Sequence, residues 1–143
     1  MIVLFDTSVW IEEFRRDALR VLIPRIQLRY QIRFDAVVAG ELQAGCRSKR
    51  DRRALARILS PYERAGRVVV PGFQDFLRAG DALSRLRQKG KTLKGVALLD
   101  AVQAADAARL GALLVTQNVS DFEMLRTSIP VAVEAFDRFR ARL

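Results

Sequence analysis

Four acidic residues stand where a parallel sheet would bring them together. Asp6 directly follows the apolar segment 2–5, and Glu41 lies shortly after a second apolar segment at 32–34. Asp100 lies near the start of an alanine-rich stretch, and Asp121 comes soon after an apolar segment at 112–115. Because ligands of open parallel sheets bind beyond the carboxyl ends of the strands, we expect these carboxylates to meet at one edge of the sheet.

Carboxylates that are brought together raise each other's pKa unless a cation lies among them. The chain has no histidine and a single cysteine, Cys46, so a bound ion would need oxygen ligands rather than a zinc-type set. Such ligands suit Mg²⁺ or Mn²⁺, which can activate water and stabilise the charge of a phosphoryl transition state. The four acids therefore indicate a metal-assisted attack of water on a phosphoryl group.

Each acid also has an ordinary structural alternative. Asp6 and Asp121 could be helix N-caps or turn residues, and Glu41 could be a solvated helix residue. Asp100 lies in an apolar run, where a lone carboxylate requires a partner or an ion.

Apolar segments alternate with helical patterns along the whole chain. We expect five strands, at residues 2–5, 32–34, 68–70, 112–115 and 131–133. We expect helices after Asp6 and at residues 19–30, 36–44, 52–59, 73–89, 96–110 and 121–126, with a last helical turn within 136–143. This order predicts an α/β fold with a mostly parallel sheet and helices on both faces, formed by residues 1–143 as a single domain.

Capping and breaking residues set the expected helix ends. Asp35 is expected to cap the helix that carries Glu41, and Gly45 to end it. Pro61 and Gly66 are expected to close the helical unit that precedes the third strand. In helix 73–89, four large side chains are expected on one side of the helix: Phe76, Leu77, Leu83 and Leu86.

The chain is strongly basic, with 25 Lys and Arg residues, 16 Asp and Glu residues, and a net charge of +9. Such a surface attracts nucleic acid, although an acidic protein partner would explain it equally well. Two basic stretches flank the acids: Arg47 and Lys49 follow Glu41, and Lys91 and Lys94 precede Asp100. They could line a nucleic-acid groove or be solvated loops.

No apolar run approaches the roughly 18–20 residues that cross a bilayer. The single cysteine cannot form an internal disulfide, which fits a reducing compartment. We therefore expect a cytoplasmic protein that does not enter the membrane.

Four segments resemble the motifs of the PIN-domain ribonucleases, in that family's order and over nearly the whole chain. The segments are IVLFDTSVWI at residues 2–11, VVAGELQAG at 37–45, LLDAVQAA at 98–105 and LVTQNVSDF at 114–122. Small size without appended domains resembles the VapC-type toxins of type II toxin–antitoxin pairs. One departure is Gln103, which replaces a usually apolar residue on the same helix face as Asp100. Asp106, six residues after Asp100, is expected to point elsewhere.

The resemblance implies an α/β/α sandwich and an Mg²⁺- or Mn²⁺-dependent endoribonuclease that hydrolyses RNA phosphodiester bonds. It implies that Asp6, Glu41, Asp100 and Asp121 form the catalytic, metal-binding pocket, with Asp6 and Asp100 closest to the metal. Four neighbouring polar residues are expected to hold these acids in place: Thr7, Ser8, Thr116 and Asn118.

The resemblance also implies partners, namely a cognate antitoxin and a second copy of the chain in a homodimer. Trp10, Phe14 and the segment 19–28 are expected in the core or at a protein interface, and an apolar groove between the first helices would be the antitoxin site. Alternative functions are a PIN-domain RNA-processing nuclease that is no toxin, and a non-catalytic RNA- or protein-binding module. A phosphoacceptor receiver-like domain is disfavoured, because Thr7-Ser8 follows Asp6 where that fold would have a further acid.

Overall fold

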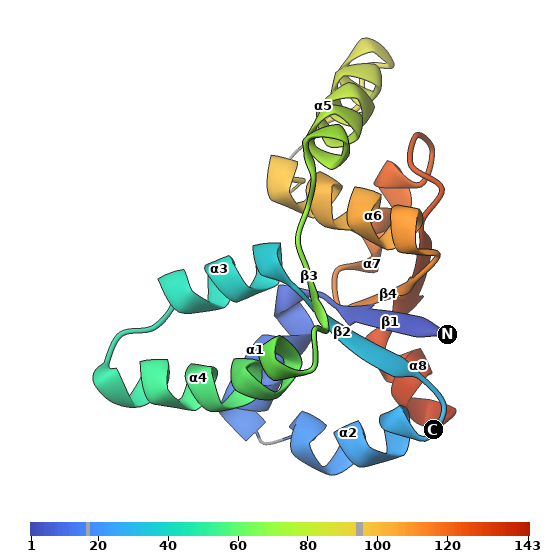
Figure 1. The fold of residues 1–143 in the computed structure, drawn as a ribbon. Helices are drawn as coiled ribbons and strands as arrows, with labels where there is room; N and C mark the ends of the chain where they lie inside the picture. Colours follow the sequence, from blue (N-terminus) through green and yellow to red (C-terminus); the bar gives the residue numbers. More distant parts are fainter. Residues whose placement is uncertain (17, 94–95) are drawn as a thin grey trace.

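A five-stranded sheet, in which all neighbouring strands are parallel, lies at the centre of the fold (Figure 1). The computed structural model describes residues 1–16, 18–93 and 96–143. The strands are β1 (Ile2–Phe5), β2 (Gln31–Asp35), β3 (Val68–Val69), β4 (Leu113–Thr116) and β5 (Ala132–Ala135), in the order β3-β2-β1-β4-β5. The expected fold class and five-stranded parallel sheet are confirmed.

Side chains of the central strand β1 alternate between two hydrophobic cores. Val3 and Phe5 pack into one core, and Leu4 packs into the other on the opposite face. All three are almost completely buried, as expected for a parallel sheet covered on both faces.

One face of the sheet is covered by α5 (Phe73–Gln88), α6 (Leu98–Leu110) and α7 (Val119–Leu125). The small side chains of Ala101, Ala104 and Ala105 are fully buried, which lets α6 lie close to its neighbours. Gly111 ends α6 as expected, because its φ of 60° is a left-handed conformation that glycine adopts readily.

The other face is covered by α1 (Thr7–Arg16), α2 (Ala18–Gln27), α4 (Lys49–Arg64) and α8 (Phe136–Ala141). Trp10 lies at the centre of this core, 4.6 Å from the ring of Phe34 and 5.8 Å from that of Phe5. The expected placement of Trp10 in the core is therefore confirmed, whereas Phe14 is partly exposed.

Helix α3 (Ala36–Ala44) begins where β2 ends and carries Glu41. The Asp35 carboxylate accepts a hydrogen bond from the Val37 backbone N–H at 2.8 Å, and Gly45 occupies the C-cap, as expected. Figure 1 shows α3 and the start of α6 on the same side of the sheet, at the carboxyl ends of the strands.

The extent of α4 differs from the sequence expectation of 52–59. The helix begins earlier because Ser48 caps it, its hydroxyl accepting from the Asp51 backbone N–H at 3.1 Å. Pro61 lies inside the last turns of the helix instead of ending it, and the chain leaves the helix through Gly66, with φ of 64°. A proline near a helix end removes one backbone hydrogen bond without preventing one further turn.

The expectation that four large apolar side chains share one side of α5 is wrong. Leu83 and Leu86 are buried, whereas Phe76 and Leu77 are exposed. The buried residues 75, 79, 82, 83 and 86 form one stripe along the helix, and Phe76 and Leu77 lie outside that stripe. Among the described residues, no helix is both long and apolar enough to span a bilayer.

Candidate active site

Asp6 lies directly beyond the carboxyl end of β1 and is only 5% exposed. One of its carboxylate oxygens, Oδ2, accepts hydrogen bonds from the Ser8 hydroxyl at 2.7 Å and the Thr116 hydroxyl at 2.8 Å. Thr116 is adjacent because β1 pairs with β4, and the Asp6 backbone N–H continues that pairing by donating to the Val115 carbonyl. The sheet register therefore fixes the orientation of the Asp6 carboxylate.

The same two hydroxyls hold the chain that follows β4. The Asn118 backbone N–H donates to the Thr116 hydroxyl oxygen at 2.9 Å, and the Gln117 backbone N–H donates to the Ser8 hydroxyl oxygen at 3.1 Å. Ser8 and Thr116 contact an acid, as the sequence indicated, whereas Asn118 takes part through its backbone. This segment leads into α7, which carries Asp121 in its first turn.

Asp100 lies in the first turn of α6, where its Oδ2 accepts from the Ala97 backbone N–H at 3.0 Å. Burial raises the pKa of the Asp100 carboxyl, the Ala97 N–H lowers it, and repulsion from Asp6 and Asp121 raises it further, with a net increase. Asp6 and Asp121 thus each lie close enough to Asp100 to repel its charge.

Glu41 completes the group from α3. Burial raises the pKa of the Glu41 carboxyl, the Thr7 hydroxyl lowers it, and repulsion from Asp100 and Asp6 raises it, again with a net increase. The structure therefore brings all four sequence-predicted acids to the same edge of the sheet, and Thr7 beside one of them.

Gln103 is buried below this group. Its side-chain amide N–H donates to the carbonyl of Phe5, the residue before Asp6, at 3.5 Å. Gln103 therefore contacts the strand that positions Asp6.

The arrangement suits a hard divalent ion. In both Asp6 and Asp100, one carboxylate oxygen accepts hydrogen bonds from protein donors. Within residues 1–16, 18–93 and 96–143, the second oxygen of each has no such donor and is left for a ligand. In the part of the chain that the structure describes, no three acids are already gathered as closely as a complete metal-binding group requires. Mg²⁺ does not need such a cage, because it usually keeps several waters and takes one or two carboxylates together with substrate phosphate.

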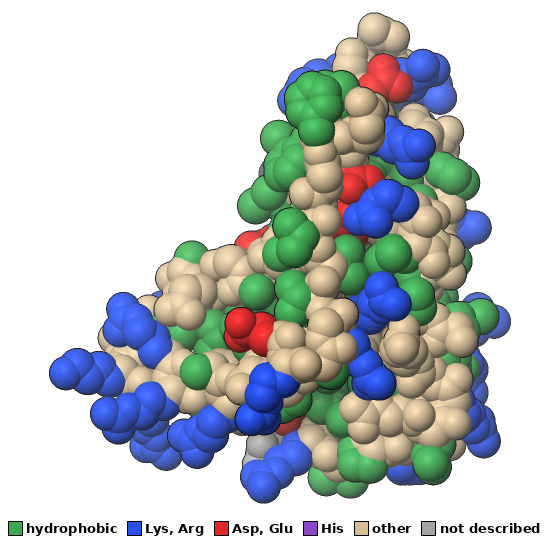
Figure 2. All heavy atoms as spheres, viewed as in Figure 1, with side chains coloured by type: hydrophobic (Ala, Val, Ile, Leu, Met, Phe, Trp, Pro, Cys, Tyr) green, Lys and Arg blue, Asp and Glu red, His purple; other side chains and the backbone are tan. Residues whose placement is uncertain are grey.

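The basic residues that could bind nucleic acid lie outside this acidic group. Arg47, Lys49 and Lys91 are exposed, and Figure 2 shows Lys and Arg side chains concentrated over the end of the molecule where α3 leads into α4. Lys94 lies outside the described residues. The structure describes no contact that tests the binding role expected for these four residues.

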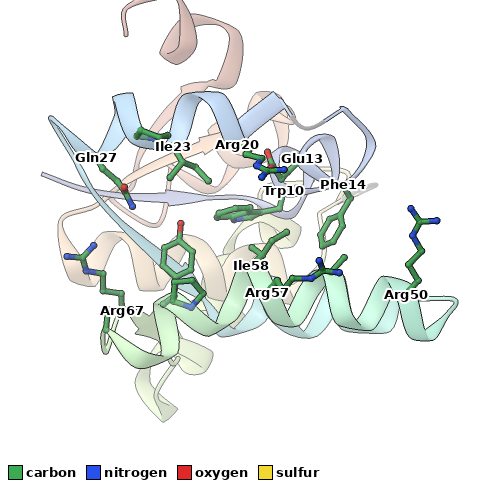
Figure 3. Close-up of a pocket in the computed structure, with 15 residues that line it drawn as sticks. Trp10, Glu13, Phe14, Arg20, Ile23, Gln27, Arg50, Arg57, Ile58 and Arg67 are labelled. Carbon is green, nitrogen blue, oxygen red and sulfur yellow. The ribbon is translucent and has the colours of Figure 1, made fainter.

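A groove of about 710 Å³ runs between α4 on one side and α1 and α2 on the other (Figure 3). Its apolar lining includes Trp10, Phe14, Ile23, Ile58 and Tyr62. Figure 3 shows Arg50 near one end of α4 and Arg67 near the other, with Arg57 between them. The groove between the first helices that the sequence suggested is thus present, with α4 as its second wall.

A network that the sequence did not indicate lies beneath the acidic edge. Asp106 is fully buried, and Arg109 donates to its Oδ1 at 2.7 Å and to both carboxylate oxygens of Asp75 at 3.1 and 3.2 Å. Asp106 thus points away from the site, as expected from its spacing. The i,i+3 spacing of Asp106 and Arg109 was the sequence signal for this network, and nothing in the sequence linked Asp106 to Asp75.

A Thr116→Val substitution is expected to weaken Mn²⁺ binding by about 10- to 100-fold, the usual cost of removing a group that orients a metal ligand. The variant loses the 2.8 Å hydrogen bond that fixes the Asp6 carboxylate while keeping the side-chain shape. Isothermal titration of the protein with Mn²⁺ measures the effect. Thr127→Val is the matched control, because Thr127 is exposed and its hydroxyl donates to the Met124 carbonyl, away from the acids; equal affinities for the two variants would refute the assignment.

Residues 3–137 match the PIN domain family, and the chain belongs to that family. The fold is similar to that of a chain in the crystal structure of VapBC2 from Rickettsia felis bound to a promoter DNA fragment, with 21% identity, a TM-score of 0.75, and coverage of 96% of this chain and 100% of the other. A chain of DNA-bound VapBC from Salmonella typhimurium is 24% identical, with a TM-score of 0.71 and coverage of 94% and 98%.

A third similar chain belongs to VapBC-5 from Mycobacterium tuberculosis, a member of the VapBC family of toxin–antitoxin systems, with 20% identity, a TM-score of 0.61 and coverage of 94% and 96%. No curated protein sequence gives a significant match. The PIN-domain resemblance seen in the four motifs is therefore confirmed, and the fold is the one found in VapBC complexes.

Proposed function

We propose that this chain is a metal-dependent endoribonuclease and the toxin of a type II toxin–antitoxin pair. The observation that carries the proposal is the group of four acids at the carboxyl edge of the sheet, in which Glu41 and Asp100 have raised pKa values through burial and mutual repulsion. A divalent cation relieves that repulsion. PIN-domain membership and the fold shared with VapBC chains support the same function.

Asp6 and Asp100 are the proposed direct ligands of Mg²⁺ or Mn²⁺, because in each of them one carboxylate oxygen has no hydrogen-bond donor among the described residues. When bound, the ion supplies an activated water and neutralises charge on the phosphate. Glu41 and Asp121 complete the ligand set or orient the attacking water. Ser8 and Thr116 hold the Asp6 carboxylate in one orientation, so that no reorganisation is needed when substrate binds.

RNA is the proposed substrate, drawn to the protein by its net charge of +9. Arg47, Lys49, Lys91 and Lys94 are proposed to contact its phosphates; the last of these lies outside the described residues. The test offers the purified protein tRNA, rRNA, mRNA and DNA of matched sequence with Mn²⁺. Cleavage of RNA that stops on adding EDTA supports the proposal, whereas cleavage of DNA alone or of neither contradicts it.

The groove between α4 and the α1–α2 pair is the proposed antitoxin site. It offers an apolar lining between arginine side chains, which suits a peptide segment that carries apolar anchors and acidic residues. The cognate antitoxin is expected to be encoded next to this chain, and the pair to act in the cytoplasm.

A second copy of the chain is proposed to dock on the exposed face of α5. Phe73 is 75% exposed and Leu77 51% exposed, and Phe76 lies beside them at helical spacing. An apolar patch of this kind marks an interaction surface, and pairing of identical patches about a two-fold axis would close it.

A Phe73→Glu/Leu77→Glu double variant is therefore expected to be a monomer under conditions in which the wild-type protein is a dimer. The expected cause is the burial of two uncompensated charges in a self-paired apolar patch. Size-exclusion chromatography with light scattering measures the mass. A Val21→Glu control on α2 should leave the dimer intact, and dimers of the double variant would exclude this face.

A further inference from the structure

Asp35 and Asp106 form a buried carboxyl pair between the start of α3 and the middle of α6. Asp35 is 1% exposed and Asp106 is 0% exposed, and their side chains lie within hydrogen-bonding range of each other. The Oδ1 atom of Asp35 accepts from the Val37 N–H, and the Oδ1 atom of Asp106 accepts from Arg109. The Oδ2 atom of each is buried without a donor among the residues that the structure describes.

Two interacting carboxylates, each with a buried oxygen that has no donor among the described residues, are unfavourable unless a proton is shared between them. The charged groups that face the pair from the packed helices are Arg109 on α6, Asp75 on α5 and Glu41 on α3. Arg109 is shared with Asp75, and Glu41 adds further repulsion. Arg109 therefore contacts two carboxylates, those of Asp75 and Asp106, and no cation contacts the Asp35 carboxylate among the residues that the structure describes.

The pair occupies a specific position relative to the acidic site. Asp35 precedes Glu41 by six residues along α3, and Asp106 follows Asp100 by six residues along α6, about 9 Å along each helix axis. Glu41 and Asp100 themselves lie close enough to repel each other. The two helices therefore approach each other at two acid pairs, one in the site and one buried behind it.

We propose that Asp35 and Asp106 share one proton in a carboxyl–carboxylate hydrogen bond that joins α3 to α6, so that this pair fixes the position of Glu41 relative to Asp100. Both are positioning residues, since neither reaches the substrate edge. The part of the proposal that concerns Glu41 and Asp100 rests on the metal site proposed above, whereas the shared proton does not.

The titration of the pair supports this arrangement. Burial raises the pKa of Asp35 to about 7, although the hydrogen bond from the Val37 N–H lowers it. Repulsion from Asp106 and Glu41 adds to the increase. Burial raises the pKa of Asp106 to about 6, although Arg109 lowers it. A raised pKa in the folded state means that the pair's contribution to stability is full below the unfolded pKa of 3.8 and is lost as the pH rises towards about 7.

The test uses the whole protein and three variants: Asp35→Asn, Asp35→Ala and the exposed control Asp81→Asn. An asparagine keeps the cap on Val37 and donates its own N–H to Asp106, so it replaces the shared proton with one that does not titrate. We expect an infrared carboxylic-acid band in the wild type and in Asp81→Asn that is lost from Asp35→Asn. The gain in melting temperature of Asp35→Asn over wild type should grow from about pH 4 to about pH 7 and then level off.

Mn²⁺ titration near pH 6 tests the positioning role. Asp35→Asn should bind within about 3-fold of wild type, whereas Asp35→Ala, folded by circular dichroism, should bind at least about 10-fold more weakly. An unchanged infrared band and parallel stability curves for Asp35→Asn would overturn the shared proton. Equal Mn²⁺ affinity in Asp35→Ala and wild type would overturn the positioning role. If wild type bound no Mn²⁺, the proposed metal site and the positioning role would both fail, and the infrared and stability results would still decide the shared proton.

Discussion

An Asp100→Asn variant is expected to cleave RNA roughly 100-fold or more slowly than wild type, since even groups that only orient metal ligands cost 10- to 100-fold when removed. The same variant should be more stable to heat near neutral pH. The pKa of Asp100 is raised by burial and by repulsion from Asp6 and Asp121, so its ionised form destabilises the metal-free protein. Asparagine removes that charge and can still accept from the Ala97 N–H.

The two effects are measured separately, by cleavage of labelled RNA with saturating Mn²⁺ and by thermal unfolding in EDTA. The stability gain should shrink as the pH falls, because Asp100 then becomes protonated in the folded wild-type protein. Asp81→Asn is the matched control, since Asp81 is exposed and pairs with Arg85 at 2.8 Å. Normal cleavage by the variant would show that Asp100 is not a metal ligand. Loss of activity through unfolding would contradict the expected gain in stability.

An Ile58→Glu substitution is expected to weaken antitoxin binding by about 30-fold or more, the effect of losing an anchor worth at least about 2 kcal/mol. Ile58 lies on α4 and lines the groove opposite α1 and α2 (Figure 3). A glutamate there places an uncompensated charge against the apolar part of the docked segment.

Titration with the protein encoded beside this chain measures the affinity. Val21→Glu is the control, because Val21 lies on α2 but is 73% exposed and lies outside the groove lining. Because Ile58 also packs against the core, circular dichroism is used to check that the variant is folded. An unchanged affinity for a folded Ile58→Glu variant would place the antitoxin elsewhere.

Local chemistry predicted most of the fold. The alternation of short apolar segments with helical patterns predicted the parallel sheet, and individual residues such as Asp35, Gly45 and Gly111 set helix ends by capping or by a left-handed conformation. These features depend on a few neighbouring residues, so a single sequence contains them.

Features that depend on tertiary packing were not predictable in the same way. Phe76 and Leu77 are large apolar residues within a helical pattern, so they were expected on the same side as Leu83 and Leu86. The packed face of α5 instead includes Asp75 and the small side chains of Ala79 and Ala82, which leaves Phe76 and Leu77 exposed. The start of α4 was not predicted, because the Ser48 cap lies within a basic run that precedes the helical pattern expected from residue 52.

The candidate site shows the same division. The motifs predicted that Asp6, Glu41, Asp100 and Asp121 would meet, and the mutual repulsion among them agrees. The buried Asp35–Asp106 pair was not predictable, since it depends on the approach of α3 to α6 across 71 residues of sequence. The catalytic roles of the four acids at the sheet edge stay predictions until metal binding is measured.

The most direct test is a single Mn²⁺ titration of antitoxin-free protein with labelled RNA, in which ion binding is followed by electron paramagnetic resonance and cleavage is followed in the same samples. The account predicts that cleavage rises in proportion to bound Mn²⁺ and is abolished both by EDTA and by Asp100→Asn. Cleavage that persists in EDTA, or full ion occupancy without cleavage of tRNA, rRNA or mRNA, would contradict it.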